Sequence, residues 1–122
     1  MDSDGYPDEQ DLGRIVAFDS LHDPVGFVKL VRPLWSYPDR FVFTEGKSQT
    51  LGRPVWKLYL STGGWSGNES LVDAMQEAGG GLWWFAFWLR SERGGHYWFE
   101  IPKAWNRPTN SAVTREVADA ES

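Results

Sequence analysis

The sequence predicts an α+β domain in which a mostly antiparallel sheet of about four to six strands carries one main helix packed on it. Short β-prone runs separated by glycine, proline and aspartate recur along the chain, whereas only residues 66–78 combine a long helical spacing of apolar side chains with a firm glycine stop. A chain of 122 residues suits a single core. We place this domain at residues 12–111, between an acidic flexible tail at 1–11 and a second flexible tail at 112–122.

The first predicted elements are short. Residues 15–18 form a β-prone apolar run bounded by Gly13 and Asp19, which indicates a strand. The apolar spacing of residues 25–35 fits either a short helix or a strand, and Pro33 argues against a helix that continues through it. The two alternatives stay open.

A hairpin-like connection is predicted in the middle of the chain. After a turn at residues 37–39, residues 40–44 are β-prone, and glycines and a proline then lead into residues 55–60. Residues 55–60 alternate strictly, with Trp56, Leu58 and Leu60 facing one side and the remaining residues facing the other. The sequence therefore predicts a half-exposed strand here.

A helix follows, and two more strands come after it. Its buried stripe is predicted to hold Leu71, Val72, Met75 and Ala78, and three glycines at 79–81 end it. Residues 82–89 are apolar on both faces, which indicates a central strand covered on each side. Residues 90–95 turn the chain into residues 96–101, so the last two strands are expected to pair as an antiparallel hairpin.

Composition excludes several kinds of site and leaves most of the aromatic residues for the core. The chain has no cysteine and only two histidines, so we expect no disulfide, no metal site and no cofactor. The start of the chain lacks the apolar region of a signal peptide, and the longest apolar run is too short to span a bilayer, which predicts no membrane partner. Eight tryptophans are present, and we expect most of them in the core.

The net charge of -5 is unevenly distributed. Residues 1–11 hold five acids and no base, and residues 112–122 hold three acids and one base. Residues 12–111 therefore carry 11 basic and nine acidic side chains, a mildly basic body. A mimic of nucleic acid would need its acids on the folded body, so this class does not fit. A nucleic-acid partner is not expected either.

A glycine-rich turn between the strand at 55–60 and the helix is the first candidate site. Backbone N–H groups at Gly63, Gly64 and Gly67 could approach an anion closely, next to the positive end of the helix dipole. Ser66 and Glu69 match a capping box, which is the structural alternative. The candidate ligand-binding residues here are Gly63, Gly64, Trp65, Ser66, Gly67 and Asn68.

The second candidate site is the predicted hairpin end, with Arg90, Arg93 and His96. A charged, solvated tip is the simple interpretation. Alternation of a strand over 82–89 also predicts that Trp84, Trp88 and Arg90 share one face, and the following strand places His96 and Trp98 on one face. If these faces coincide, tryptophan, arginine and histidine converge in a way that suits stacking of a base and neutralisation of a phosphate.

Catalysis has less support than binding. His96 with Glu92 or Glu100 and a serine such as Ser61 or Ser66 would make an acid–base set, but neither a nucleophile-elbow spacing nor a metal-ligand spacing is present. The sequence favours a non-enzymatic binding protein.

Two motifs together carry a resemblance. The run at residues 61–69, Ser-Thr-Gly-Gly-Trp-Ser-Gly-Asn-Glu, and the run at 93–97, Arg-Gly-Gly-His-Tyr, resemble a group of small bacteriophage and prophage proteins of no assigned function. The resemblance covers roughly residues 55–101 and implies a phage-encoded accessory protein in the host-cell cytoplasm. It implies no activity and no catalytic residues.

Two functions of different classes follow. The first is a binder of a small anionic, nucleotide-like ligand, with counter-defence as its setting. The second is a protein–protein effector that inhibits or adapts a host factor through a patch of Trp65 and the hairpin arginines. A pocket between the glycine turn and the hairpin favours the first, and a flat aromatic patch favours the second. An exposed sheet edge leaves a homodimer open.

Overall fold

The structure is a computed structural model that describes residues 6–48 and 52–105. The four strands found in these residues form one antiparallel sheet in the order β1-β2-β4-β3, so the last of them in the sequence lies between β2 and β3. The strands are β1 (Phe41–Lys47), β2 (Pro54–Ser61), β3 (Trp88–Glu92) and β4 (His96–Pro102).

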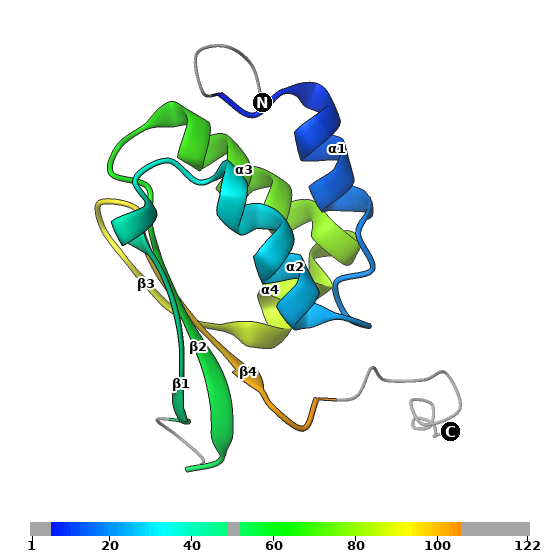
Figure 1. Cartoon of the computed structure of the whole chain (residues 1–122), viewed down its shortest axis with the longest axis vertical. Coiled ribbons are helices and arrows are strands. Elements are labelled where there is room, and N and C mark those ends of the chain that lie inside the picture. The colour runs from blue at the N-terminus through cyan, green and yellow to red at the C-terminus, as the bar shows by residue number, and fades with distance from the viewer. Residues whose placement is uncertain (1–5, 49–51, 106–122) are drawn as a thin grey trace.

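Helices cover one side of this sheet (Figure 1). They are α1 (Glu9–Ala17), α2 (Pro24–Val31), α3 (Ser66–Glu77) and α4 (Leu82–Phe87), with the short 3₁₀ turns η1 (Arg32–Leu34), η2 (Pro38–Arg40) and η3 (Ala78–Gly81). The predicted α+β class with an antiparallel sheet is confirmed, and α3 is the longest helix at 12 residues. No helix in the described part of the chain is both long and apolar enough to cross a membrane.

The strand predicted at residues 15–18 is wrong, because this run belongs to α1. Asp8 caps the helix by accepting from the N–H of Asp11, and the Asp11 carboxylate accepts in turn from the N–H of Asp8. This capping box starts the helix at Glu9 and brings the fully buried Ile15 into the core. Residues 9–11, which the charge pattern assigns to the tail, form the first turn of α1.

The open alternative at residues 25–35 is decided in favour of a helix. Asp23 accepts from the N–H of Gly26 at 2.9 Å, Pro24 takes the first helical position, and Pro33 lies in the 3₁₀ turn that ends the segment. The hairpin of β1 and β2 is present as predicted, with β1 continuing to Lys47. Residues 49–51 of its connection lie outside the described residues.

The helix predicted at residues 66–78 is confirmed as α3 and its continuation. Leu71, Val72, Met75 and Ala78 are all buried on its inner side. Gly79, Gly80 and Gly81 all have positive φ angles, between 61° and 87°, which end the helix and reverse the chain.

The strand predicted at residues 82–89 is wrong over most of its length. Residues Leu82–Phe87 form α4, and β3 begins only at Trp88. Trp83 and Phe87, four residues apart, bury one side of this helix, whereas Phe85 on its other side is 83% exposed. The exposed side of this helix is as apolar as its buried side. An apolar run of this length does not distinguish a covered strand from a helix.

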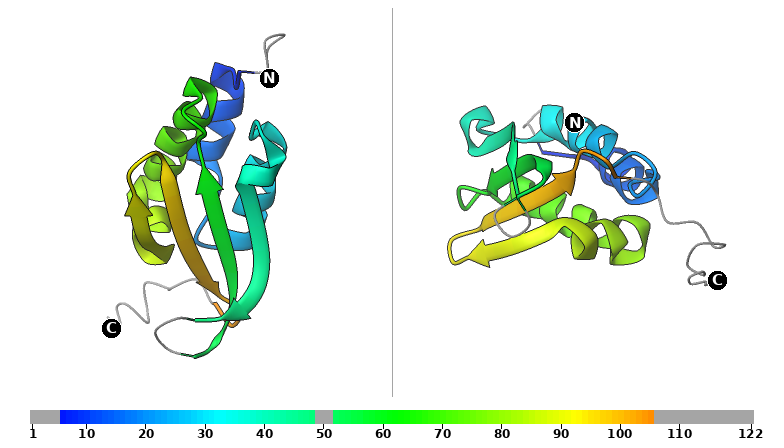
Figure 2. Two further views of the ribbon diagram at one scale, coloured as in Figure 1. Left: turned by 90° about the vertical axis from the view of Figure 1, so that its left-hand side faces the viewer. Right: turned by 90° about the horizontal axis from the view of Figure 1, so that it is seen from below.

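The sheet therefore has one covered face and one open face. Leu58, Leu60, Phe99 and Ile101 point toward the helices and are 0–1% exposed. The left view of Figure 2 looks onto the sheet with the helices behind it. We call the side away from the helices the open face.

Most tryptophans contribute to the core, as expected. Trp35 and Trp83 are buried, and Trp56, Trp84 and Trp105 pack against the core cluster. The indole of Trp105 also donates to the carbonyl of Leu21 at 2.7 Å. Three tryptophans remain outside the core cluster, namely Trp65, Trp88 and Trp98.

Candidate functional site

The glycine turn and the β3–β4 hairpin, the two motifs singled out in the sequence, meet at one end of the sheet. The N–H of Thr62 donates to the carbonyl of Gly95 at 3.0 Å, and a side chain at Gly95 would overlap the Thr62 hydroxyl. Gly63 and Gly64 both have positive φ angles, 63° and 74°. The sequence is thus rich in glycine here because the turn needs left-handed backbone and because Thr62 closely approaches the hairpin.

The start of α3 corrects the capping-box interpretation. The helix begins at Ser66, so its N-cap is Trp65, which makes no side-chain capping bond. The Trp65 N–H instead donates to the Thr62 carbonyl, and the helix starts one residue earlier than a Ser66 cap requires. The Ser66 hydroxyl donates to Tyr6 Oη at 3.2 Å.

Trp65 has a structural partner on each side. Its ring stacks on Tyr6 with centroids 4.6 Å apart and lies so close to Gly67 that any β-carbon there would enter the indole. Gly67 is therefore needed for packing of Trp65.

Asn68 is completely buried and joins three segments. Its side-chain N–H groups donate to the carbonyls of Ser36 at 2.9 Å and Thr62 at 3.3 Å, and its oxygen accepts from the N–H of Ser36 at 2.9 Å. These bonds use both N–H groups and the oxygen of the amide in holding the segment after α2 against the glycine turn. Asn68 is a structural residue in this arrangement.

The cavity between the glycine turn and the hairpin does not suit an anion. It has a volume of about 310 Å³ and carries two carboxylates from α3, Glu69 and Asp73. The cavity is not lined by Arg90, Arg93 or His96. A shared pocket does exist at this junction, but its charge is opposite to the charge that the anion hypothesis requires.

The open face of the sheet gathers the aromatic and basic groups instead. The antiparallel register places Tyr59 opposite Trp98, Trp98 opposite Arg90, and Val42 opposite Tyr59. One row across all four strands therefore reads Val42, Tyr59, Trp98 and Arg90. In the neighbouring row His96 lies between Ser61 and Glu92.

Three rings form the centre of this surface, and we call Tyr59, His96 and Trp98 the aromatic trio. The ring centroids of Tyr59 and Trp98 are 5.1 Å apart. The ring centroid of His96 lies 6.0 Å from that of Tyr59 and 6.2 Å from that of Trp98. The Tyr59 hydroxyl and His96 Nδ1 form a hydrogen bond of 2.7 Å, which fixes the two rings in nearly parallel planes, 13° apart. All three side chains are half-buried, so part of each ring reaches solvent.

An arginine lies on each side of the aromatic trio. The Arg90 guanidinium carbon is 4.1 Å from the centroid of the Trp98 ring, a cation–π contact, and Arg90 also pairs with Glu92 at 3.1 Å. On the other side, Arg40 donates to the Ser61 hydroxyl at 3.3 Å and its side chain lies against Gly63. Among the described residues, Arg40 makes no ion pair with a carboxylate.

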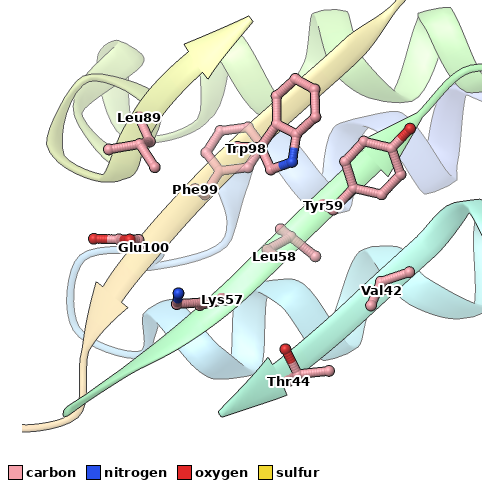
Figure 3. Close-up of a pocket in the computed structure, with 9 residues that line it drawn as sticks. All are labelled: Val42, Thr44, Lys57, Leu58, Tyr59, Leu89, Trp98, Phe99 and Glu100. Carbon is pink, nitrogen blue, oxygen red and sulfur yellow. The ribbon is translucent and has the colours of Figure 1, made fainter. Parts of the chain in front are cut away.

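The surface beside the trio is a shallow hollow of about 190 Å³ (Figure 3). Figure 3 shows the rings of Tyr59 and Trp98 side by side above their strands, with Lys57 and Glu100 further along the same two strands. The hollow is lined by Val42, Thr44, Lys57, Leu58, Tyr59, Leu89, Trp98, Phe99 and Glu100.

The structure thus separates the predicted site residues into groups. Arg90 and His96 come together on the open face through Trp98, as the converging-face hypothesis requires for these three residues. Trp84 does not join them, because it lies on α4 and packs on Tyr97 and Phe99 at the covered face. Arg93 is exposed at the hairpin tip, away from the trio's described contacts.

The remaining predicted residues belong to the turn and to the start of α3. Gly63 lies beside Arg40 and so borders the open face, whereas a side chain at Gly64 would meet no other group and the Gly64 N–H donates to the Thr62 hydroxyl at 3.3 Å. Trp65, Ser66, Gly67 and Asn68 have the structural contacts described above.

Sequence reasoning missed Tyr59 and Arg40 as site residues, and it named Trp98 only as a residue that shares a face with His96. Alternation placed Tyr59 on the outer side of its strand and Trp98 with His96, so the signal was present in each strand separately. The two residues come together only because β2 pairs with β4, and this pairing cannot be predicted from the sequence because the two strands are far apart in it. Nothing in the sequence around Arg40 indicates that it reaches Ser61.

The arrangement suits binding better than catalysis. The described hydrogen bond of the His96 ring goes to Tyr59 and to none of the serines or acids that an acid–base set needs. Within residues 6–48 and 52–105, no cluster of three or more His, Asp or Glu side chains could hold a metal ion. What the open face offers is a set of ring surfaces for a planar group and two guanidinium groups for an anion. No family model, curated protein or solved structure matches the chain.

Proposed function

We propose that this chain is a non-enzymatic binding protein whose open sheet face takes a small anionic ligand of the nucleotide type. The observation that carries the proposal is the aromatic trio with an arginine on either side. The trio offers flat apolar area for a base, and Arg40 and Arg90 offer charge for a phosphate on both sides of it.

The two arginines differ in what a phosphate must displace. Arg90 is already paired with Glu92, in a contact where both side chains are about half exposed. Arg40 has no described carboxylate partner and is oriented by the Ser61 hydroxyl, so a phosphate meets a charge that needs little rearrangement. Arg40 is therefore the expected phosphate contact, and Arg90 stays stacked beside the base.

Thermal unfolding in the presence of mono-, di- and cyclic nucleotides tests this function, because a ligand that binds the native state raises the midpoint. We expect at least one nucleotide to raise it, and Trp98→Ala to abolish the shift. Trp88→Ala is the matched control, since Trp88 is an exposed tryptophan with a hydrogen bond to Ser91 and no contact with the trio.

The arginines offer a second matched pair. Arg40→Ala is expected to weaken the shift, whereas Arg93→Ala at the hairpin tip leaves it unchanged. The absence of a shift across the panel, or a shift that Arg93→Ala removes and Arg40→Ala keeps, overturns the proposal.

The resemblance to phage and prophage proteins supplies the biological setting of this proposal. A phage accessory protein that binds a nucleotide in the host cytoplasm could act in counter-defence by sequestering a signalling nucleotide. Expression of the wild-type chain and of Trp98→Ala in a host that restricts phage by such a signal tests this setting. Equal protection by the two chains counts against it.

A protein–protein effector is the second candidate, and the exposed side of α4 favours it. Leu82 is 52% exposed, Phe85 83% and Trp88 46%, so three large apolar side chains face solvent on one short segment. A host-lysate pull-down is expected to recover a specific protein that Phe85→Asp loses and that Trp65→Ala retains. Recovery of nothing above background counts against this candidate.

A further inference from the structure

The open face can hold a ligand longer than one nucleotide. Its hollow is shallow, and its two arginines lie at opposite sides of the sheet, Arg40 just before β1 and Arg90 on β3. A single nucleotide on the trio places its phosphate at one arginine and leaves the other arginine without a phosphate. A ligand that uses the whole surface must cross the sheet.

The distance across the sheet sets the length of that ligand. Strands in a sheet are about 4.8 Å apart, so the three intervals from β1 to β3 span about 14 Å. A nucleic-acid strand rises about 3.4 Å per nucleotide in a duplex and more when extended, so about three nucleotides cover this distance. The trio lies on β2 and β4, in the middle of that path.

The rings select unpaired bases. Base faces are hidden between neighbours in a duplex, whereas a single strand can place successive bases on neighbouring aromatic rings. Tyr59 and Trp98 are cross-strand neighbours with centroids 5.1 Å apart, so they offer adjacent positions for two bases. Stacking of this kind tolerates any base.

Charge is compatible with such a ligand but predicts moderate affinity. The sequence as a whole argues against a nucleic-acid partner because its net charge is -5, yet the acids that produce this charge lie in the two tails. The open face carries three basic side chains and two acidic ones, namely Arg40, Lys57 and Arg90 against Glu92 and Glu100. Glu92 is paired with Arg90. Stacking must therefore supply a large share of the binding energy.

We infer that the open face binds a single-stranded oligonucleotide across its four strands, with two bases on Tyr59 and Trp98 and the backbone held by Arg40 and Arg90. This inference rests on the proposed function and names its ligand class. It differs from a mononucleotide site in requiring both arginines at once.

Fluorescence anisotropy with labelled ten-nucleotide strands tests it. The probes are oligo-deoxythymidine, oligo-uridine and a ten-base-pair duplex, with thymidine monophosphate as an unlabelled competitor. We expect the single strands to bind at least about fivefold more tightly than the mononucleotide, since a second stacked base contributes at least that factor. The duplex is expected to bind more weakly than either strand. A preference between the deoxy and ribo strands identifies the sugar, and either preference supports the inference.

Variants assign the contacts. Trp98→Ala is expected to weaken single-strand binding by about tenfold or more. Arg40→Ala and Arg90→Ala should each lower the slope of log affinity against log salt by about 0.7, the value for one phosphate contact on a single strand. Arg93→Ala and Trp88→Ala are the controls and are expected to change neither. The arginine variants keep the test decisive if Trp98→Ala does not fold.

The outcomes separate this inference from the function it rests on. If a mononucleotide binds in a Trp98-dependent way and the strands bind no more tightly, or if the duplex binds equally well, the oligonucleotide inference is overturned and the nucleotide function stands. If neither mononucleotides nor strands bind, both are overturned.

Discussion

Strands β2 and β4 present two surfaces that differ in almost every respect, although their residues alternate along the same backbone. On the covered face Leu58, Leu60, Phe99 and Ile101 are 0–1% exposed and entirely apolar. On the open face the rings of Tyr59, His96 and Trp98 are only partly buried. Tyr59 and His96 hydrogen-bond to each other, and Tyr59 packs against Trp98. The side chains of the covered face must be apolar because the helices pack against them. No described element accounts in the same way for the residue types of the open face.

This contrast separates aromatic residues that stabilise the fold from those free to bind. Trp83 touches the rings of Phe27, Phe87 and Phe99, with centroids 4.8 to 5.6 Å away, and is fully buried. Trp98 has two aromatic neighbours and an arginine, all on the open face. A tryptophan count alone does not reveal this division, and four predictions examine it.

The largest expected effect is that of Trp83→Ala, which removes a buried ring from the centre of the covered side. We expect it to lower the free energy of unfolding by about 3–5 kcal/mol. Trp98→Ala, the comparison on the open face, should cost no more than about 1.5 kcal/mol, because its ring is half exposed and leaves no cavity. Urea unfolding followed by circular dichroism measures both. Equal losses would show that the open face belongs to the core.

Asn68→Ala comes next and decides between a ligand contact and a structural role. It removes three hydrogen bonds and leaves the Ser36 N–H without its partner, so we expect a loss of about 3 kcal/mol in stability. Nucleotide binding measured well below the lowered melting temperature should be unchanged. A binding defect without a loss of stability would return Asn68 to the site.

Gly95→Ala examines the junction at which the two motifs meet. Gly95 has a φ of 80°, and an added methyl group would overlap the Thr62 hydroxyl. We expect a loss of about 2 kcal/mol, from left-handed strain together with the overlap. Gly64→Ala is the matched control, because Gly64 has a φ of 74° with open space around it, and it should lose only about 1 kcal/mol. Equal losses in thermal or urea unfolding would mean that the contact with Thr62 contributes nothing.

Glu92→Gln should have the smallest effect on stability and acts on the open face alone. The pair with Arg90 has both side chains about half exposed, so its loss should change the free energy of unfolding by less than about 0.5 kcal/mol. Removing the carboxylate frees Arg90 and lowers repulsion of a phosphate, so affinity for a nucleotide should rise about twofold to threefold, measured by titration at low salt. Unchanged or weaker affinity would remove Arg90 from the proposed site.

Sequence patterns predicted the elements whose two sides differ in polarity. Residues 55–60 alternate, and the structure places Leu58 and Leu60 inward and Tyr59 outward as expected. The buried stripe of α3 was predicted from Leu71 to Ala78 for the same reason. The patterns failed at residues 82–89, where the exposed side chains of Leu82 and Phe85 are as apolar as the buried Trp83, so neither period is visible. They failed at 15–18 because the run is too short to show a period.

The site could be predicted only in part, because it depends on register between strands that are distant in the sequence. His96 and Arg90 are neighbours through a local hairpin, and the sequence suggested both. Tyr59 reaches His96 only because β4 pairs with β2, across 37 residues. The turn motif gave the opposite result, since Gly63 and Gly64 serve its left-handed backbone and Gly67 serves the packing of Trp65. Local composition does not distinguish such needs from ligand binding.

The position of β4 in the sheet has a consequence for synthesis of the protein. Of the four described strands, β4 is the last to leave the ribosome, yet it fills the middle of the sheet, between β2 and β3. Until residues 96–102 emerge, β2 is paired on one side only and β3 has no neighbour at all, so the nascent chain exposes two strand edges that the finished protein conceals. A nascent chain whose residues 96–102 are still inside the ribosome would have an incomplete sheet and an aggregation-prone edge, whereas one that has emerged as far as Trp105 is able to close the sheet.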